Sequence, residues 1–138
     1  MHTELAREAR PPITLTHTEA ETLWGLALAS QDKAPLTARL LLEELERAET
    51  YAEGCLPPHI ATMRSMVAFL DEATGEPHEV QLVYPGEADN AQHRISIMTP
   101  IGAALIGLAR GTSIDWRNRA GEFRRLRILE VSHPPARA

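Results

Sequence analysis

The sequence has little cysteine and no long apolar run, and these two absences exclude several classes of protein. Cys55 is the only cysteine among the 138 residues, so the chain cannot form an internal disulfide, a redox pair or a multi-cysteine metal site. No apolar run approaches the roughly 20 residues that a membrane-spanning helix needs. The first residues, MHTELAREARPP, are polar and charged, unlike a secretory signal. We therefore expect a cytoplasmic protein without a membrane partner.

Patterns typical of metal and nucleotide sites are also missing. Gly102 and Gly107 have the spacing of a phosphate-binding loop, but Leu108 and Ala109 stand where that loop needs lysine and serine or threonine. No two histidines have the four-residue spacing that would place two imidazoles on one helical face for zinc. They are His2, His17, His59, His78, His93 and His133. We expect no metal and no cofactor, and we expect the two glycines to allow close packing or to cap a helix.

Aromatic residues are scarce, and no catalytic set is evident. Two Phe and two Tyr are too few for the aromatic-walled proline pocket of a prolyl isomerase. Glu87 and Asp89 are an acid and base pair in type, but they lie in a Pro-Gly turn with no nucleophile beside them. Their carboxylates are expected to bond local backbone N–H groups. We expect no catalytic residue and no enzymatic activity.

Charge is distributed unevenly along the chain. Residues 1–54 hold ten acids and five bases, or −5, whereas residues 94–138 hold eight arginines and three acids, or +5. Five of these arginines cluster near the last predicted hairpin: Arg117, Arg119, Arg124, Arg125 and Arg127. They suit a solvated hairpin or contact with an acidic protein surface. Direct nucleic-acid binding is disfavoured, because the whole chain is acidic and no stacking aromatics alternate with the arginines.

The first part of the chain has the pattern of two helices. Thr16 followed by Glu19 is the capping-box pattern of a helix start. From Glu19 to Ser30, apolar residues recur at helical spacing and share one face; they are Ala20, Leu23, Trp24, Ala27 and Leu28. A second helix, roughly Leu36 to Ala52, places Leu41, Leu45 and Ala48 on one side and Glu43, Glu44, Glu46, Arg47 and Glu49 mainly on the other. The two predict an antiparallel helical hairpin within residues 1–55.

The rest of the chain, residues 56–138, has the pattern of a sheet domain. Five short runs rich in β-branched or apolar residues predict strands: Met66 to Leu70, Glu79 to Tyr84, Arg94 to Ile97, Thr112 to Trp116 and Phe123 to Val131. Residues 71–76 and 118–121 read as hairpin turns. The alanine-rich run Pro100 to Leu108 predicts one short helix. The fold class is therefore α+β, a helical hairpin followed by an antiparallel sheet packed by one helix.

Two stretches of this second part resemble the C-terminal domain of the Gre transcript-cleavage factors. They read VYPGEAD at residues 83–89 and ISIMTPIGAALIG at residues 95–107, and Gly111 follows. The upstream run LPPHIATMRS, residues 56–65, and the chain length resemble the bacterial regulators of nucleoside diphosphate kinase more closely. The resemblance covers residues 13 to 133. The chain is identified as a member of this regulator family, with a GreA/GreB-type C-terminal domain.

The resemblance implies an FKBP-like domain over about residues 60 to 133 and a regulator that binds RNA polymerase near its secondary channel, in competition with Gre-type factors. It also implies a link to nucleoside diphosphate kinase. The docking residues that match the Gre-domain loop are Met98, Thr99, Pro100 and Ile101.

The predicted hairpin tip departs from the Gre pattern. Gre factors present acidic residues there that help to hold a catalytic magnesium ion, whereas here Asp32 stands beside Lys33. One carboxylate next to an ammonium is a poor magnesium ligand set. We therefore expect a non-enzymatic protein that binds polymerase without cleaving the transcript. We also expect it to be a monomer. The alternatives are a transcript-cleavage elongation factor and a free-standing protein-interaction module.

Overall fold

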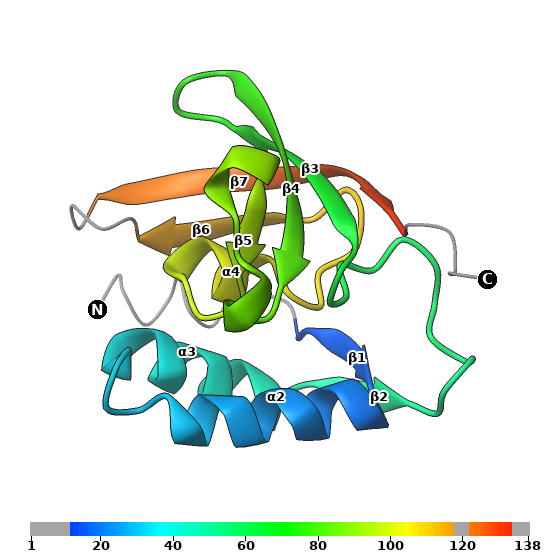
Figure 1. Cartoon of the computed structure of the whole chain (residues 1–138). Coiled ribbons are helices and arrows are strands. Elements are labelled where there is room, and N and C mark those ends of the chain that lie inside the picture. The colour runs from blue at the N-terminus through cyan, green and yellow to red at the C-terminus, as the bar shows by residue number, and fades with distance from the viewer. Residues whose placement is uncertain (1–11, 118–121, 134–138) are drawn as a thin grey trace, which may run out of the picture.

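The computed structural model describes residues 12–117 and 122–133 of the chain, and it confirms the α+β fold class (Figure 1). A helical unit (residues 12–51) lies across one end of a sheet unit (residues 60–133), with α4 of the sheet unit facing α3. The FKBP-like character of the sheet unit stays a prediction. The predicted turn at 118–121 and Arg119 lie outside the described residues.

The first helix is close to the prediction. Helix α2 spans His17–Ala29, and the Thr16 hydroxyl accepts a hydrogen bond from the Glu19 backbone N–H at 3.1 Å. This bond satisfies one of the amide groups that the first turn leaves free. The apolar face is narrower than predicted, because Leu23 and Ala27 are buried whereas Trp24 and Leu28 are 38% and 47% exposed.

The second helix is shorter than predicted. Helix α3 spans Pro35–Glu46, and the chain then forms β2, Glu49–Tyr51, which pairs in parallel with β1, Thr14–Thr16. The backbone N–H of Glu49 donates to the Ile13 carbonyl at 2.8 Å. The helix prediction was therefore wrong beyond Glu46, since the backbone there bonds to another strand.

The placement of Glu44 on the solvated side of α3 was also wrong. Glu44 is only 2% exposed, and its carboxylate accepts a hydrogen bond from Arg47 one turn later at 3.0 Å. A buried charge needs such a partner. Leu41 and Leu45 are buried as predicted.

The sheet unit holds all five predicted strands in the order β5-β4-β3-β7-β6. They are β3 Met66–Asp71, β4 Glu76–Val83, β5 Arg94–Ser96, β6 Ser113–Arg117 and β7 Phe123–Ser132. The pairs β3–β4, β3–β7 and β6–β7 are antiparallel, as predicted, but β5 pairs with β4 in parallel. The prediction of a purely antiparallel sheet was therefore wrong for the edge strand β5. The chain between β4 and β5 forms two short 3₁₀ turns, Pro85–Glu87 and Asn90–Gln92, and re-enters the sheet in the same direction.

The short helix α4, Pro100–Leu105, packs against the end of β5, and Gly102 makes that approach possible. A Cβ atom at Gly102 would lie 2.3 Å from the Ser96 carbonyl oxygen. Gly107 has a φ of +77°, and a Cβ atom there would lie 2.5 Å from the Cβ of Ile13. Both glycines therefore serve close packing, as the sequence predicted.

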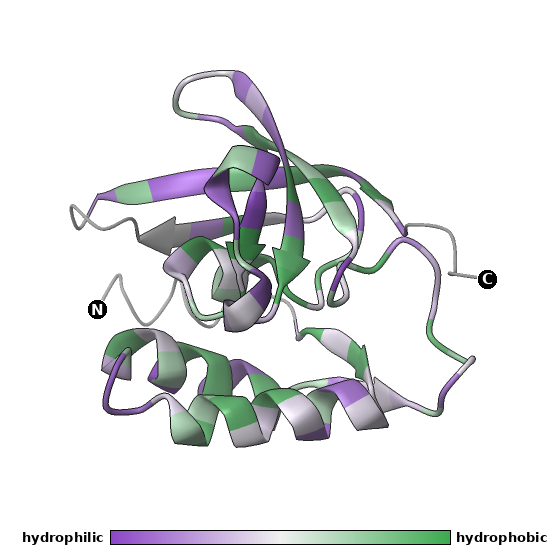
Figure 2. Ribbon diagram, viewed as in Figure 1, coloured by the Kyte–Doolittle hydropathy of each residue, from purple (hydrophilic) through white to green (hydrophobic). Residues whose placement is uncertain are grey.

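One buried apolar cluster runs through both units. It includes Leu23, Leu41 and Ile13 of the helical unit together with Val67 and Leu105 of the sheet unit. Figure 2 shows apolar residues on the helices and on the central strands near α4, and mostly hydrophilic residues on the projecting end of the β3–β4 hairpin. The predicted boundary near residue 55 thus lies between two units whose buried apolar residues form one cluster. Whether the units fold separately stays a prediction.

Candidate partner-binding site

The predicted docking residues form a tight turn between β5 and α4. The Thr99 hydroxyl accepts from the Gly102 backbone N–H at 3.1 Å and donates to the Ser96 carbonyl at 2.7 Å. The Ser96 hydroxyl accepts from the Met98 N–H at 2.9 Å. Thr99 is therefore the N-cap of α4, and Pro100 occupies the first helical position. The turn is fixed by its own hydrogen bonds before any partner arrives.

The four docking side chains are all half-buried. Met98 and Ile101 pack against the core, so only part of each is accessible to a partner. Rigid, half-buried apolar groups suit recognition, because little conformational entropy is lost when they are covered. The structure brings the four predicted residues together, and their role in binding stays a prediction.

A second ordered loop, Tyr84 to Asp89, leads toward the docking turn through β5. The Glu87 carboxylate accepts from the Tyr84 backbone N–H at 3.3 Å, and the Asp89 carboxylate accepts from the Ala91 N–H at 3.1 Å. These bonds confirm that both acids fix the loop.

Arg64 ties this loop to the segment that enters the sheet unit. Its guanidinium donates to the Glu87 carboxylate at 2.7 Å and lies 5.4 Å from the centre of the Tyr84 ring. The bond to Arg64 lowers the pKa of Glu87 and raises that of Arg64. Arg64 has a φ of +68°, a left-handed conformation that is uncommon outside glycine. Sequence reasoning missed Arg64, because no residue pattern marks this backbone conformation.

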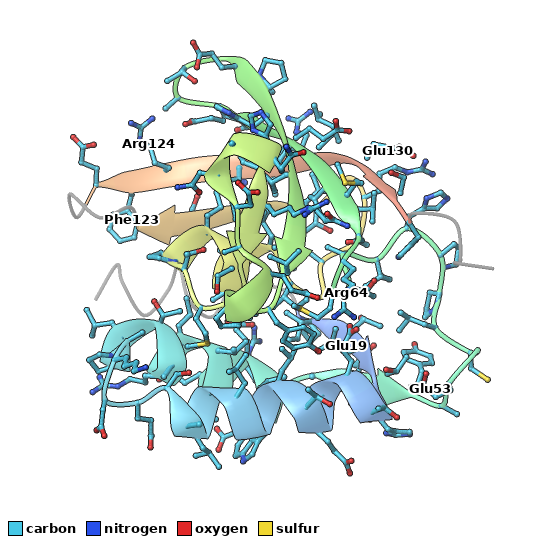
Figure 3. All side chains as sticks on the ribbon, in the orientation of Figure 1. Glu19, Glu53, Arg64, Phe123, Arg124 and Glu130 are labelled. Carbon is cyan, nitrogen blue, oxygen red and sulfur yellow. The ribbon has the colours of Figure 1, made fainter. Side chains whose placement is uncertain are left out.

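Glu19 faces the same loop from α2, and sequence reasoning gave it only a capping role (Figure 3). Burial raises the pKa of its carboxyl, and the facing Met63 backbone N–H lowers it to a smaller extent. Burial likewise raises the pKa of Tyr84, with the Glu19 charge adding to the effect. The capping-box spacing predicted that Glu19 lies in the first turn of α2. It did not predict that the carboxyl of Glu19 lies against the sheet unit.

The tip residues Asp32 and Lys33 lie in the turn between α2 and α3, and both are exposed. Among the described residues, no group of three His, Cys, Asp or Glu side chains could hold a metal ion. The outer surface near the tip is apolar instead: Leu28 and Leu36 are 47% and 77% exposed. The tip thus combines one acid and one base with exposed leucines.

The arginine cluster of the last hairpin is a mixed-charge surface. Arg124 pairs with Asp71 at 3.1 Å, and Arg127 pairs with Glu72 at 3.1 Å. Arg125 bonds Asp115 at 3.1 Å and lies 3.5 Å from Glu72. These acids neutralise much of the positive charge that the sequence suggested.

Comparison with known proteins identifies the family. Residues 57–133 match the model of the transcription elongation factor GreA/GreB C-terminal domain. The chain is 34% identical to the regulator of nucleoside diphosphate kinase of Escherichia coli K12, over 94% of this chain and 96% of that protein. It is 38% identical to the transcription inhibitor protein Gfh1 of Thermus aquaticus, over 72% of this chain and 66% of that protein.

A solved structure agrees with this result. The GreA/GreB transcription elongation factor from Nitrosomonas europaea superposes with a TM-score of 0.72 at 37% identity, covering 90% of this chain and all of that chain. No helix within the described residues is long and apolar enough to cross a membrane. The chain therefore belongs to the family of regulators of nucleoside diphosphate kinase, with a GreA/GreB-type C-terminal domain, and is a transcription-associated regulator related to the Gre factors.

Proposed function

We propose that this chain binds RNA polymerase through the turn Met98 to Ile101, near the entrance of the secondary channel, and does not catalyse transcript cleavage. Its helical unit obstructs that opening, so that it competes with Gre-type factors. Localisation in the cytoplasm, where polymerase acts, follows from this role. The single observation that carries the proposal is the match to the GreA/GreB C-terminal domain over residues 57–133.

The geometry of the docking turn supports binding. Thr99 fixes the turn through three bonds, two by its hydroxyl and one from its backbone N–H to Ser96 at 3.1 Å. Pro100 is held at the start of α4 with its ring partly exposed. A preorganised apolar contact of this kind contributes to affinity by reducing the ordering that binding requires.

The helical unit supports regulation without catalysis. Helix α2 has 13 residues, or about 20 Å of length, and its tip offers Asp32 alone beside Lys33. Magnesium is usually held by carboxylates and substrate oxygens together, and one carboxylate next to a lysine in the sequence adds little. The name of the Thermus aquaticus relative, a transcription inhibitor, is in line with a Gre-related protein that does not stimulate cleavage.

The test is a binding titration on purified core polymerase with paired variants. Replacing Thr99→Arg together with Pro100→Ala places charge and bulk at the turn, and affinity should fall about thirty-fold, equivalent to about 2 kcal/mol. The matched control is Thr99→Ser with Pro100→Ala, which keeps the capping hydroxyl and should bind within a few-fold of the parent chain.

The control separates the loss of contact with polymerase from the loss of the helix cap. Thermal melts of both variants measure how much stability the arginine variant loses with the Thr99 hydroxyl, expected to be about 1 kcal/mol. Unchanged affinity of the arginine variant, with its fold intact, would remove Met98 to Ile101 from the interface. If the unmodified chain fails to bind polymerase at micromolar concentrations, the free-standing interaction module becomes the better account.

A further inference from the structure

One oxygen of the Glu19 carboxyl is buried in the seam, the contact of α2 and β1 with the sheet unit, although the residue as a whole is half-buried. Its Oε1 atom is shielded from solvent and has no hydrogen-bond partner among the described residues. The backbone N–H of Glu19 is already bonded to Thr16 and keeps the residue in the first turn of α2. An ionised carboxylate with one unsatisfied buried oxygen is costly, whereas a protonated carboxyl is much less so.

The groups that face Glu19 come from three other parts of the chain. Arg64 and the Met63 N–H lie on the segment before β3, Glu53 lies after β2, and Tyr84 lies at the end of β4. Figure 3 shows Glu19 and Arg64 directed toward each other between α2 and the sheet unit. Only Arg64 carries a positive charge among the groups that act on this carboxyl.

The positive charge of Arg64 is already used by another acid, because its guanidinium is bonded to the Glu87 carboxylate at 2.7 Å. Glu53 adds negative charge on the other side, and Tyr84 is neutral at physiological pH. Ionised Glu19 is therefore compensated first by the Met63 backbone N–H and to a smaller extent by Arg64, whose charge is shared with Glu87. The compensation is incomplete, because Oε1 has no hydrogen-bond partner among the described residues.

We propose that Glu19 is a proton-controlled latch between the helical unit and the sheet unit, closed when its carboxyl is protonated and loosened when it is ionised. The proton passes between the Glu19 carboxyl and solvent. Loss of the proton leaves a buried charge that draws Arg64 away from Glu87 or opens the seam to water. This inference is independent of the identity of the partner that the chain binds.

The direction of the pH dependence follows from the raised pKa. The folded chain holds the Glu19 proton more tightly than the unfolded chain, so the stabilising contribution is complete below the ordinary pKa of a glutamate, about 4.3. It is lost as pH rises through the folded-state pKa. The seam should therefore loosen as pH rises above the ordinary pKa of a glutamate and through the folded-state pKa of Glu19.

The first test is hydrogen exchange of the full chain from about pH 4, near the ordinary pKa of a glutamate, to about pH 8, corrected for the intrinsic pH dependence of exchange. Protection of the Thr14 amide, which is bonded across the seam to the Gly107 carbonyl, and of the first turn of α2 should fall several-fold in the parent chain as pH rises through the folded-state pKa of Glu19. In Glu19→Gln the protection should stay constant. Glu21→Gln, a change at an exposed position of the same helix, should behave as the parent chain does.

Two further measurements complete the test. The ¹³C shift of the Glu19 carboxyl should titrate with a midpoint above the ordinary pKa of a glutamate, about 4.3. Glu87→Gln releases Arg64 and should lower the Glu19 midpoint. A Glu19 midpoint at the ordinary value of a glutamate, about 4.3, or the same fall of protection in Glu19→Gln as in the parent chain, overturns the latch. If the Glu19 midpoint is unchanged in Glu87→Gln, Arg64 is not shared between the two glutamates.

Discussion

The helical unit and the sheet unit are stabilised in different ways. In the sheet unit, β3 is paired on both sides along its whole length, with β4 and β7. In the helical unit, β1 and β2 pair over three residues each, and α2 and α3 bury a few apolar side chains. Long-range pairing thus supports the sheet unit from within, whereas the helical unit relies on the surface it covers.

The seam between the units shows this dependence in detail. The Thr14 backbone N–H donates to the Gly107 carbonyl at 2.9 Å, and Ile13 and Leu15 are almost fully buried. The helical unit therefore completes its core with atoms of the sheet unit. The comparison predicts that the sheet unit is the scaffold on which the helical unit depends.

Separating the units should have the largest effect. We expect residues 58–138 to fold cooperatively and to retain measurable polymerase affinity, at lower stability than the full chain because the surface under Ile13 and Leu41 becomes exposed. We expect residues 1–54 to be largely unfolded or self-associated, since isolated helices of this length are marginal in water. Circular dichroism melts of both fragments report this. An unfolded 58–138 fragment would show that neither unit is an independent scaffold.

Substitution at Gly107 should be the next largest effect. Gly107→Ala combines a left-handed backbone with a contact 2.5 Å from Ile13, and we expect a loss of about 2–4 kcal/mol of unfolding free energy. Gly111→Ala is the matched control, because its φ is +89° with nothing within 4 Å, and it should cost about 1 kcal/mol. Equal losses in chemical denaturation would mean that the seam is loosely packed.

The two threonine caps compare the units directly. Thr16→Ala removes the acceptor of the Glu19 N–H in α2, and Thr99→Ala removes the acceptor of the Gly102 N–H in α4. Each change should cost about 1 kcal/mol, with serine at either position restoring most of it. Local hydrogen exchange should rise in α2 alone for the first variant. If exchange rises evenly over the whole chain instead, the two units are not stabilised in different ways.

The smallest effect is expected on the open face of the sheet. Arg127→Gln breaks the 3.1 Å pair with Glu72, in which the arginine side chain is 53% exposed. We expect at most about 0.5 kcal/mol, decreasing with added salt. A loss of more than about 1 kcal/mol of unfolding free energy in urea titrations would show that this exposed arginine pair contributes to stability.

Much of the sheet unit could be predicted from the sequence, because its strands are β-branched or apolar runs bounded by turn residues. The start of α4 at Pro100 was predicted from the proline and the alanine-rich run, although the helix ends at Leu105 and not at Leu108. The segment Glu49–Tyr51 could not, because a parallel pair of three residues has no periodic signal. The parallel pairing of β5 likewise depends on two short 3₁₀ turns whose geometry the sequence does not specify.

The candidate site was predicted less completely. The position of Met98 to Ile101 at a helix start followed from Thr99 and Pro100, whose residue types suit an N-cap and a first turn. The cluster of Glu19, Arg64 and Tyr84 did not follow. It depends on the left-handed backbone of Arg64 and on contact between segments far apart in the chain.

The measurement that tests the central claim most directly is transcript length in purified backtracked polymerase complexes supplied with magnesium. Addition of this chain alone should leave the transcript unchanged, and its addition before a Gre-type factor should slow the shortening which that factor causes. Magnesium-dependent shortening by this chain alone would contradict the account and favour a transcript-cleavage factor. Undiminished Gre-stimulated shortening at saturating chain would contradict the shared binding site.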